Sequence, residues 1–152
     1  MQFLKKIFSK KIIFKSIEQT DVILLDNQFA NLNLGKIKNH IYNPDVYYIN
    51  TFLLSLKIFI LNFFKKNFSL IYFEILIKKL RPKVAVGHEM NSNIFTFKKF
   101  LPRAKTICYQ FGYIFNEDIN SFYKKNFDGK IVDYFLGYDE RSILIMNKFL
   151  KT

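Results

Sequence analysis

Short apolar runs alternate with longer amphipathic segments along this chain, and the alternation predicts the order of its secondary structure. The short runs are rich in Val, Ile and Tyr and are bounded by polar residues, which is typical of strands buried within a sheet. A run at 11–15 indicates either an extra short strand or part of an N-terminal arm. The main strand candidates are residues 21–26, 45–49, 83–87, 105–110 and 131–136.

Two consecutive helices are predicted between the second and third of these strands. Residues 52–66 are apolar nearly all round, so we expect this helix to be buried on most sides. In 68–80 the apolar residues recur at helical spacing and form one face, with Glu74 and the lysines elsewhere. Arg81 precedes a proline and therefore avoids the α-helical region, so the second helix is expected to end there.

Two more helices are predicted in the second half of the chain. One of the polar residues at 91–93 is expected to cap a helix over 94–100. The stretch 116–129 is polar and predicts a loop that contains at most a short helix. Asp139 and Glu140 are expected in the first turn of the last helix, where negative charge suits the helix dipole.

The order of strands and helices indicates the fold class. Strands that alternate with helices favour a parallel sheet, because a parallel connection needs a crossover segment. We therefore predict an α/β, Rossmann-like domain with a mostly parallel sheet of about five strands and helices on both faces. Residues 1–20 are expected to form an N-terminal arm, and residues 21–152 the domain itself.

Composition narrows the classes of partner. The net charge of +12 invites a nucleic-acid or anionic-membrane interpretation, but only three of the 24 cationic residues are arginines. Sequence-specific nucleic-acid proteins rely on arginine, so we predict no nucleic-acid partner. The single cysteine, Cys108, excludes an internal disulfide and a multi-cysteine zinc site, and its apolar surroundings predict a core residue.

The most apolar segment, residues 51–64, is too short to span a membrane. It contains fourteen residues and is interrupted by Lys57, whereas a membrane helix needs about 20 apolar residues. We expect a buried helix or one that lies on a membrane surface. The first eight residues, MQFLKKIF, lack the long apolar region of a signal peptide.

The candidate functional residues lie just after the predicted strands. Open parallel sheets bind ligands beyond the carboxyl ends of their strands. His88 at a strand end has the chemistry of a general base, and Glu89 beside it is the second catalytic candidate. The expected substrate-binding residues are Asp26, Asn91, Gln110, Gly112 and Tyr113.

Each of these residues also has a purely structural interpretation. Loops at strand ends are polar in any α/β protein, His88 could be hydrogen-bonded locally, and Gly112 could belong to an ordinary tight turn. The chain contains no G-x-G-x-x-G or G-x-x-x-x-G-K-[ST] motif and no cluster with metal-ligand spacing. We therefore predict no cofactor and no metal.

Four features in residues 21–140 together resemble a known family. They are a Tyr-containing helix that ends in KLRPK, an apolar strand with a polar end, a short helix that ends in FLP, and a strand that ends in Gln-x-Gly. This order resembles the N-terminal half of bacterial surface-carbohydrate biosynthesis glycosyltransferases of the two-Rossmann-domain GT-B type, which are related to CDP-glycerol glycerophosphotransferases. The family tends to have Asp-Asn where this chain has His88-Glu89, and Asn or His where it has Phe111.

The resemblance implies a role on the acceptor side. In such enzymes the first domain mainly binds the acceptor and the second mainly binds the nucleotide-sugar donor. It implies a glycan or lipid-linked acceptor, His88 or Glu89 as general base, and a cytoplasmic location or one on the inner face of the cytoplasmic membrane. We expect the chain to be a fragment or half of a split enzyme that works with a second domain or as a homo-oligomer. The alternative is a non-catalytic basic protein that associates peripherally with anionic membranes.

Overall fold

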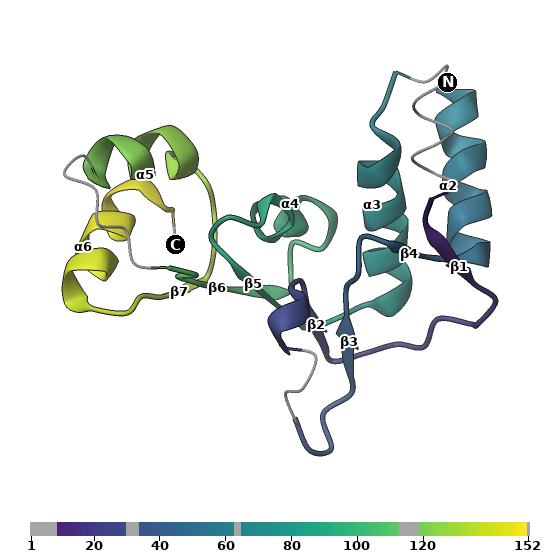
Figure 1. Cartoon of the computed structure of the whole chain (residues 1–152), viewed down its shortest axis with the longest axis horizontal. Coiled ribbons are helices and arrows are strands. Elements are labelled where there is room, and N and C mark those ends of the chain that lie inside the picture. The colour runs from purple at the N-terminus through teal and green to yellow at the C-terminus, as the bar shows by residue number, and fades with distance from the viewer. Residues whose placement is uncertain (1–8, 30–33, 63–64, 113–118, 152) are drawn as a thin grey trace. The chain divides into compact units, whose positions relative to one another are not determined.

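The computed structural model describes residues 9–29, 34–62, 65–112 and 119–151 (Figure 1). The chain divides into two compact units. Unit 1 contains Met1–Thr20 and Asn43–Arg81, and unit 2 contains Asp21–Tyr42 and Pro82–Thr152. The predicted N-terminal arm, 1–20, thus belongs to the same unit as the segment 43–81.

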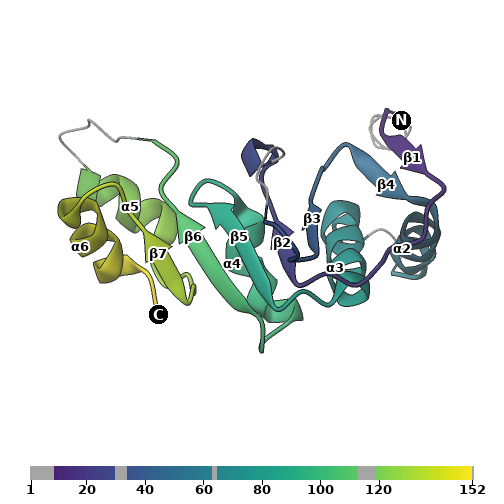
Figure 2. The same cartoon turned by 90° about the horizontal axis from the view of Figure 1, so that it is seen from below.

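Unit 2 contains an all-parallel five-stranded sheet, as the alternation of strands and helices predicted. The chain enters at β2, moves outward to β3, and then returns past β2 to add the remaining strands in order. The sheet order β3-β2-β5-β6-β7 is that of a doubly wound, Rossmann-like fold (Figure 2). These strands are Val22–Leu24 (β2), Asn39–Ile41 (β3), Val84–His88 (β5), Lys105–Tyr109 (β6) and Tyr134–Leu136 (β7).

The expected second strand of this sheet was wrong. Residues 45–49 do contain a strand, β4 (Val46–Tyr48), but it pairs with β1 (Lys11–Ile13) in unit 1. The neighbour of β2 is instead β3, whose sequence is Asn-His-Ile. This edge strand has only three residues, two of them polar, so it gives no apolar run in the sequence. His40, which was assigned to a polar loop, lies in it, and burial lowers the pKa of its imidazole.

The helices of unit 2 begin where capping residues stand. The side chain of Asn91 accepts the amide hydrogen of Asn93 at the start of α4 (Ser92–Phe100), and Asp139 caps α6 (Glu140–Phe149). A short 3-10 helix, η1 (Asn27–Phe29), follows β2. The predicted loop contains α5 (Ile119–Phe127), a nine-residue helix whose low overall hydropathy concealed it.

The core of unit 2 lies around the central strands. Ile23, Ala85 and Cys108 on β2, β5 and β6 are completely buried. Burial also raises the pKa of the Cys108 thiol, which confirms this cysteine as a core residue and not an activated nucleophile. The helices add their own fully buried side chains, namely Ile94, Phe97, Tyr123, Phe127 and Met146.

Unit 1 consists of the parallel strand pair β1–β4 and two helices, α2 (Ile49–Leu61) and α3 (Phe68–Leu80). The segment 11–15 therefore contains a strand, which was one of the two alternatives. Helix α3 has the predicted bounds, and Arg81 ends it in a left-handed conformation with φ 49°. The helices pack side by side (Figure 1), around the aromatic side chains of Tyr47, Phe52, Phe59, Phe68 and Tyr72.

Helix α2 is less buried than its sequence predicted. Only four of its residues, among them Phe52 and Phe59, are buried, whereas several large apolar side chains reach the surface. The expectation of burial on most sides is wrong because unit 1 provides α3 and a small strand pair, which cover one face of a helix. Within the described residues, no helix is long and apolar enough to cross a membrane.

Candidate functional site

Three of the predicted site residues, Asp26, His88 and Asn91, stand where the sheet order changes direction. The chain leaves β2 toward β3 on one side, whereas β5 pairs with β2 on the other. Such a switch point opens a crevice at the carboxyl ends of the two strands, and ligands of doubly wound folds bind there. Asp26 follows β2, His88 ends β5, and the register pairs His88 with Tyr109 on β6.

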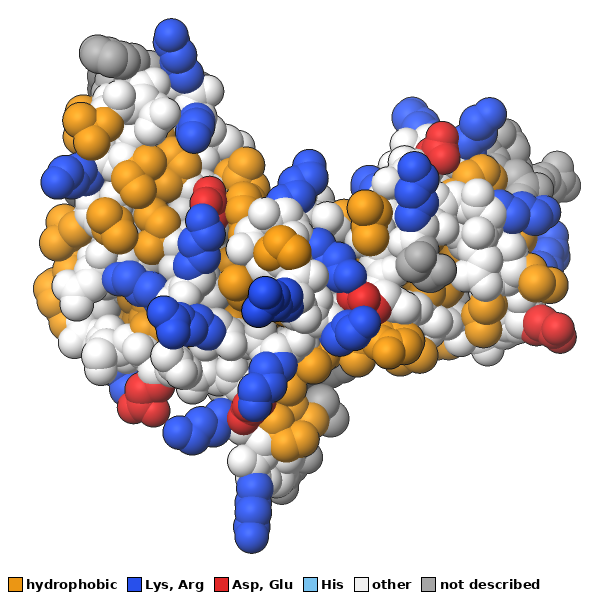
Figure 3. Space-filling model, turned by 180° about the vertical axis from the view of Figure 1, so that it is seen from behind, with side chains coloured by type: hydrophobic (Ala, Val, Ile, Leu, Met, Phe, Trp, Pro, Cys, Tyr) orange, Lys and Arg blue, Asp and Glu red, His pale blue; other side chains and the backbone are white. Residues whose placement is uncertain are grey.

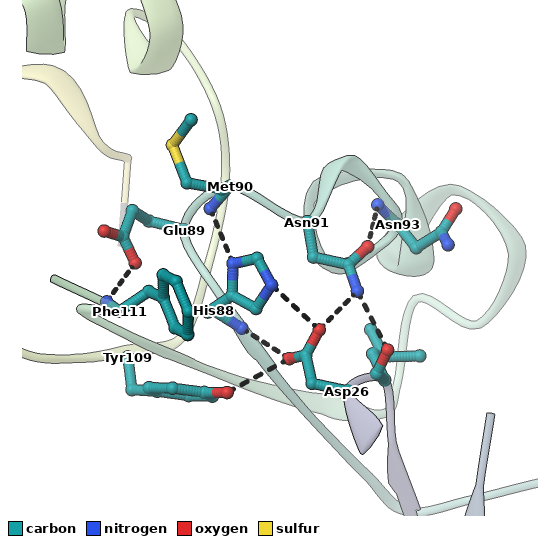
Figure 4. A network of polar contacts seen from close by, with 9 residues as sticks. Asp26, His88, Glu89, Met90, Asn91, Asn93, Tyr109 and Phe111 are labelled. Atoms are coloured by element: carbon teal, nitrogen blue, oxygen red, sulfur yellow. Dashed lines mark hydrogen bonds and ion pairs between the residues drawn. The ribbon is translucent and has the colours of Figure 1, made fainter. Parts of the chain in front are cut away.

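Asp26 is the centre of a closed hydrogen-bond network (Figure 4). Its Oδ2 accepts the His88 backbone N–H at 2.8 Å and the Tyr109 hydroxyl at 3.3 Å. Its Oδ1 accepts the Asn91 amide at 2.8 Å and lies 3.1 Å from His88 Nε2. Each carboxylate oxygen therefore has two donors, so this buried group is satisfied by its own neighbours.

The orientation of His88 bears on its predicted role as a base. Nε2 faces the Asp26 carboxylate, and Nδ1 accepts the backbone N–H of Met90 at 3.1 Å. This pattern assigns the proton to Nε2 and uses the remaining lone pair of Nδ1 within the protein. A general base needs a free lone pair aimed at the substrate, so in this arrangement His88 is better suited to position Asp26 than to take a proton.

Asn91 connects β2 to the start of α4. Its Oδ1 accepts the Asn93 N–H at 3.1 Å, while its Nδ2 donates to Asp26 and to the Leu25 carbonyl, the latter at 2.9 Å. Both amide hydrogens are thus engaged. The strands approach closely here, since a Cβ added to Gly87 would lie 3.2 Å from Leu25 Cβ, and glycine permits this approach.

Glu89 points away from this network, as expected for the residue that follows His88 in an extended segment (Figure 4). Its carboxylate accepts the Phe111 backbone N–H at 2.6 Å, and its side chain is only 3 % exposed. Burial raises the pKa of this carboxyl, although the backbone N–H groups of Glu89 and Phe111 oppose the shift. A carboxyl with a raised pKa is suited to proton transfer, so Glu89 is the stronger catalytic candidate of the two.

Tyr123 of α5 has a buried polar atom without a partner. Its side chain is completely buried, and its hydroxyl finds no hydrogen-bond partner in the part of the chain that the structure describes. Burial, together with the charges of Glu89 and Asp139, raises the pKa of Tyr123 to about 12. The phenol therefore stays protonated, and it lies within electrostatic reach of Glu89.

Gln110 and Gly112 join the ends of β6 and β7. The Gln110 amide donates to the Gly112 carbonyl at 2.9 Å, and its oxygen accepts the Tyr138 N–H at 3.1 Å. No described atom lies within 4 Å of a Cβ built on Gly112. Tyr113, the other substrate-binding candidate in this loop, lies outside the described residues.

Phe111 separates the two groups of polar residues. Its ring lies 4.9 Å from that of His88 between ring centres, and it is about half exposed. Tyr138 donates its hydroxyl to the Phe111 carbonyl at 3.2 Å. An exposed aromatic ring beside polar groups offers a stacking surface for a flat or sugar-like ligand.

The structure thus brings Asp26, His88 and Asn91 together, and it places Glu89 and Gln110 beside the next strand end. Sequence reasoning missed Tyr109 and Tyr123. The register of β6 against β5 provides a signal for Tyr109, because His88 is its partner residue. Among the described residues, no three His, Cys, Asp or Glu side chains converge to hold a metal ion.

Comparisons of the chain with protein-family models, with curated proteins and with solved structures find no match. The structure itself shows an α/β unit with a five-stranded parallel sheet.

Proposed function

We propose that this chain is the acceptor-side part of a glycosyltransferase-like protein of cell-surface polysaccharide biosynthesis. The observation that carries the proposal is the buried Glu89 carboxylate at the carboxyl edge of a doubly wound sheet, which accepts the Phe111 backbone N–H at 2.6 Å and whose pKa is raised by burial. A base of this kind removes the proton of an acceptor hydroxyl as it attacks a sugar donor. The sequence resemblance supports the same reaction class.

In this proposal the residues divide into two groups. Asp26, His88 and Asn91 hold β2, β5 and α4 in fixed positions through their mutual hydrogen bonds. Glu89 takes the proton, and the exposed ring of Phe111 receives a sugar face. Donor binding belongs to a second Rossmann domain, supplied elsewhere in the polypeptide or by another chain, at the inner face of the cytoplasmic membrane.

The test is a transfer assay that combines this chain with a separate donor-binding Rossmann domain, membrane acceptors, and a panel of nucleotide-sugar and CDP-glycerol donors. We expect transfer that Glu89→Gln lowers at least about a hundredfold, the usual contribution of a general base. The matched control is Glu18→Gln, which removes an exposed carboxyl from unit 1. Equal activity in both variants would remove Glu89 from the mechanism, and no transfer with any donor would contradict the proposed reaction class.

One observation favours a second candidate function, peripheral binding to anionic membranes. Helix α2 presents an apolar stripe whose members are 40–65 % exposed and are spaced at i, i+1, i+7 and i+8. Lys and Arg side chains outnumber Asp and Glu on the face shown in Figure 3, and hydrophobic side chains lie between them over α2 and α3. The stripe consists of Leu53, Leu54, Ile60 and Leu61.

Co-sedimentation with vesicles tests this second candidate. We expect the chain to bind phosphatidylglycerol vesicles at low salt and to dissociate as salt is added, because lysine attraction to anionic lipid is screened. The double variant Leu54→Gln, Leu61→Gln is expected to weaken binding about tenfold or more, since two aliphatic side chains that would be buried in the lipid are lost. Leu144→Gln on α6, which is 58 % exposed, is the control. An equal loss in the control variant would contradict a specific role for α2.

A further inference from the structure

Unit 1 contains an open cavity with an unusual balance of charge. Its volume is about 470 Å³, within the range of about 300–1,000 Å³ typical of small-molecule sites. Four of its nine lining residues are cationic and none is acidic. The cationic ones are Lys15, Lys78, Lys79 and Arg81.

The cavity lies where strands β1 and β4 end, helix α2 begins and helix α3 ends. Lys15, Ser16 and Ile17 follow β1, while Tyr48 and Asn50 stand at the junction of β4 with α2. The N-cap of α2, Tyr48, makes no side-chain capping bond to the first backbone N–H groups of this helix. The other side comes from the last turn of α3, and every lining residue belongs to unit 1.

Most of this positive charge is not neutralised within the protein. Lys78 pairs with Glu74 one turn earlier on α3, an exposed i, i+4 pair. Lys15, Lys79 and Arg81 have no acidic partner among the described residues. Three cations that converge on one cavity repel one another, and an anion in the cavity would relieve that repulsion.

The backbone conformation of Arg81 is unusual for a residue with a side chain. It occupies the left-handed region, with φ 49° and ψ 47°, at the position after a helix where glycine is strongly preferred. A residue with a side chain is strained there. The chain nevertheless has an arginine at this position, and this residue lines the cavity.

We propose that this cavity binds a phosphate-bearing ligand. Phosphate groups carry several negative charges and several acceptor oxygens, which suits three uncompensated cations together with neutral donors. The neutral donors are the Ser16 hydroxyl and the side-chain amides of Gln19 and Asn50. This site is separate from Glu89 and does not rest on the proposed transferase function.

Titration calorimetry with the full chain tests the proposal, with inorganic pyrophosphate as the probe and about 0.1 M salt in the buffer. At this ionic strength the screening length is about 10 Å, so attraction to scattered surface lysines is weak while a convergent site persists. We expect one saturable site. Arg81→Gly should weaken binding about tenfold or more, because a charge-assisted hydrogen bond is lost.

The Arg81→Gly variant also separates a loss of binding from misfolding. Glycine is the preferred residue at this φ, so Arg81→Gly should leave the thermal midpoint unchanged or raise it while affinity falls. Lys79→Gln is a second variant with the same expected loss. The matched control is Lys124→Gln, which removes one exposed cation from α5 in unit 2 and should leave affinity within twofold.

A second arm identifies the source of the phosphate. Short-chain dihexanoyl phosphatidic acid, kept below its micelle concentration, is added to the chain that holds pyrophosphate. Displacement indicates a site that accepts a lipid headgroup, and pyrophosphate binding without displacement indicates a soluble phosphorylated ligand; both support the proposal. Absence of binding by both probes, or an equal loss of affinity in Lys124→Gln and Arg81→Gly, would overturn it.

Discussion

The two units each place polar side chains beyond the carboxyl ends of parallel strands, but with opposite charge balance. In unit 2 the Asp26 carboxylate meets four donors from His88, Asn91 and Tyr109, so the group is satisfied. In unit 1 the cations Lys79 and Arg81 line a cavity without an acidic partner among the described residues. Polar groups that satisfy one another by hydrogen bonds hold strands together. Cationic residues that line a cavity without acidic partners favour an external anionic ligand.

The two kinds of site should respond differently to mutation. Removing a group from a closed network leaves buried donors or acceptors unsatisfied, which costs free energy. Removing a group from an open, strained or charged site lowers the free energy of unfolding little or raises it, and the substitution instead impairs function. Four substitutions test the difference, two in closed networks and two in open or desolvated positions.

The largest effect is expected at Asp26. Asp26→Ala leaves the donors of His88, Asn91 and Tyr109 without their shared acceptor in a buried place, and should lower the free energy of unfolding by about 3 kcal/mol. Urea denaturation measures this change. A loss below about 1 kcal/mol would mean that the network does not hold the strand ends together, and the contrast with unit 1 would disappear.

A second closed network is expected to give a pH-dependent effect. Asp133 accepts bonds from Lys98 at 2.8 Å, from the Thr106 backbone N–H at 2.8 Å and from Lys105 at 3.2 Å. Although burial alone would raise the pKa of the Asp133 carboxyl, these donors hold it well below its ordinary value. Asp133→Asn should therefore cost about 2 kcal/mol at neutral pH.

The sign of the pH dependence follows from the lowered pKa of Asp133. Its contribution is complete above the ordinary carboxyl pKa of 3.8 and is lost as the pH falls through the lower folded value. The stability difference between wild type and Asp133→Asn should hence be constant from pH 7 to about pH 5 and shrink below pH 4. Thermal melts across this range measure it, and a difference that grows with acid would contradict the assignment.

The third substitution, at Arg81, is expected to increase stability. Arg81→Gly should raise the free energy of unfolding by about 1 kcal/mol, because glycine adopts the left-handed conformation without strain. Chemical denaturation measures this gain. A substantial loss of stability instead would show that Arg81 makes structural contacts that outweigh its strain, and would place it with Asp26 in the closed class.

The smallest effect is expected at Glu89. Burial raises the pKa of this carboxyl, so its stabilising contribution is present below the ordinary value of 4.5 and is lost as the pH rises through the folded value. Glu89→Gln keeps an oxygen for the Phe111 N–H and should be slightly more stable than wild type at pH 7, by less than about 1 kcal/mol. Melts at pH 7 and pH 4 should show this advantage disappear in acid; a variant less stable at pH 7 would mark Glu89 as structural.

Much of the fold followed from the sequence, because strands β5 and β6 each have five mostly apolar residues and helix α3 has a clear apolar face. Segments 83–87 and 105–110 coincide with β5 and β6 within one residue at each end, and 68–80 coincides with α3. β3 escaped detection because an edge strand of three residues needs no apolar pattern. The division into two units was also not visible, since β4 gives the same signal whether it joins a large sheet or a small one.

The candidate site could also be predicted only in part. Proximity of Asp26, His88 and Asn91 could be predicted, because strand order places the ends of β2 and β5 together. Which atoms face one another could not, since His88 Nδ1 meets a backbone N–H only through the turn at Met90. The cationic cavity was missed because Lys15 and Arg81 are far apart in sequence and meet only through the pairing of β1 with β4.

The contrast between the two units is tested most directly by mapping pyrophosphate binding on the full chain with backbone amide NMR spectra. We predict saturable shift changes at residues 15–19, 48–50 and 78–81 around the cavity, with the amides of Asp26, His88 and Asn91 unchanged. Changes centred on the Asp26 network, or spread evenly over lysines such as Lys124, would contradict the account.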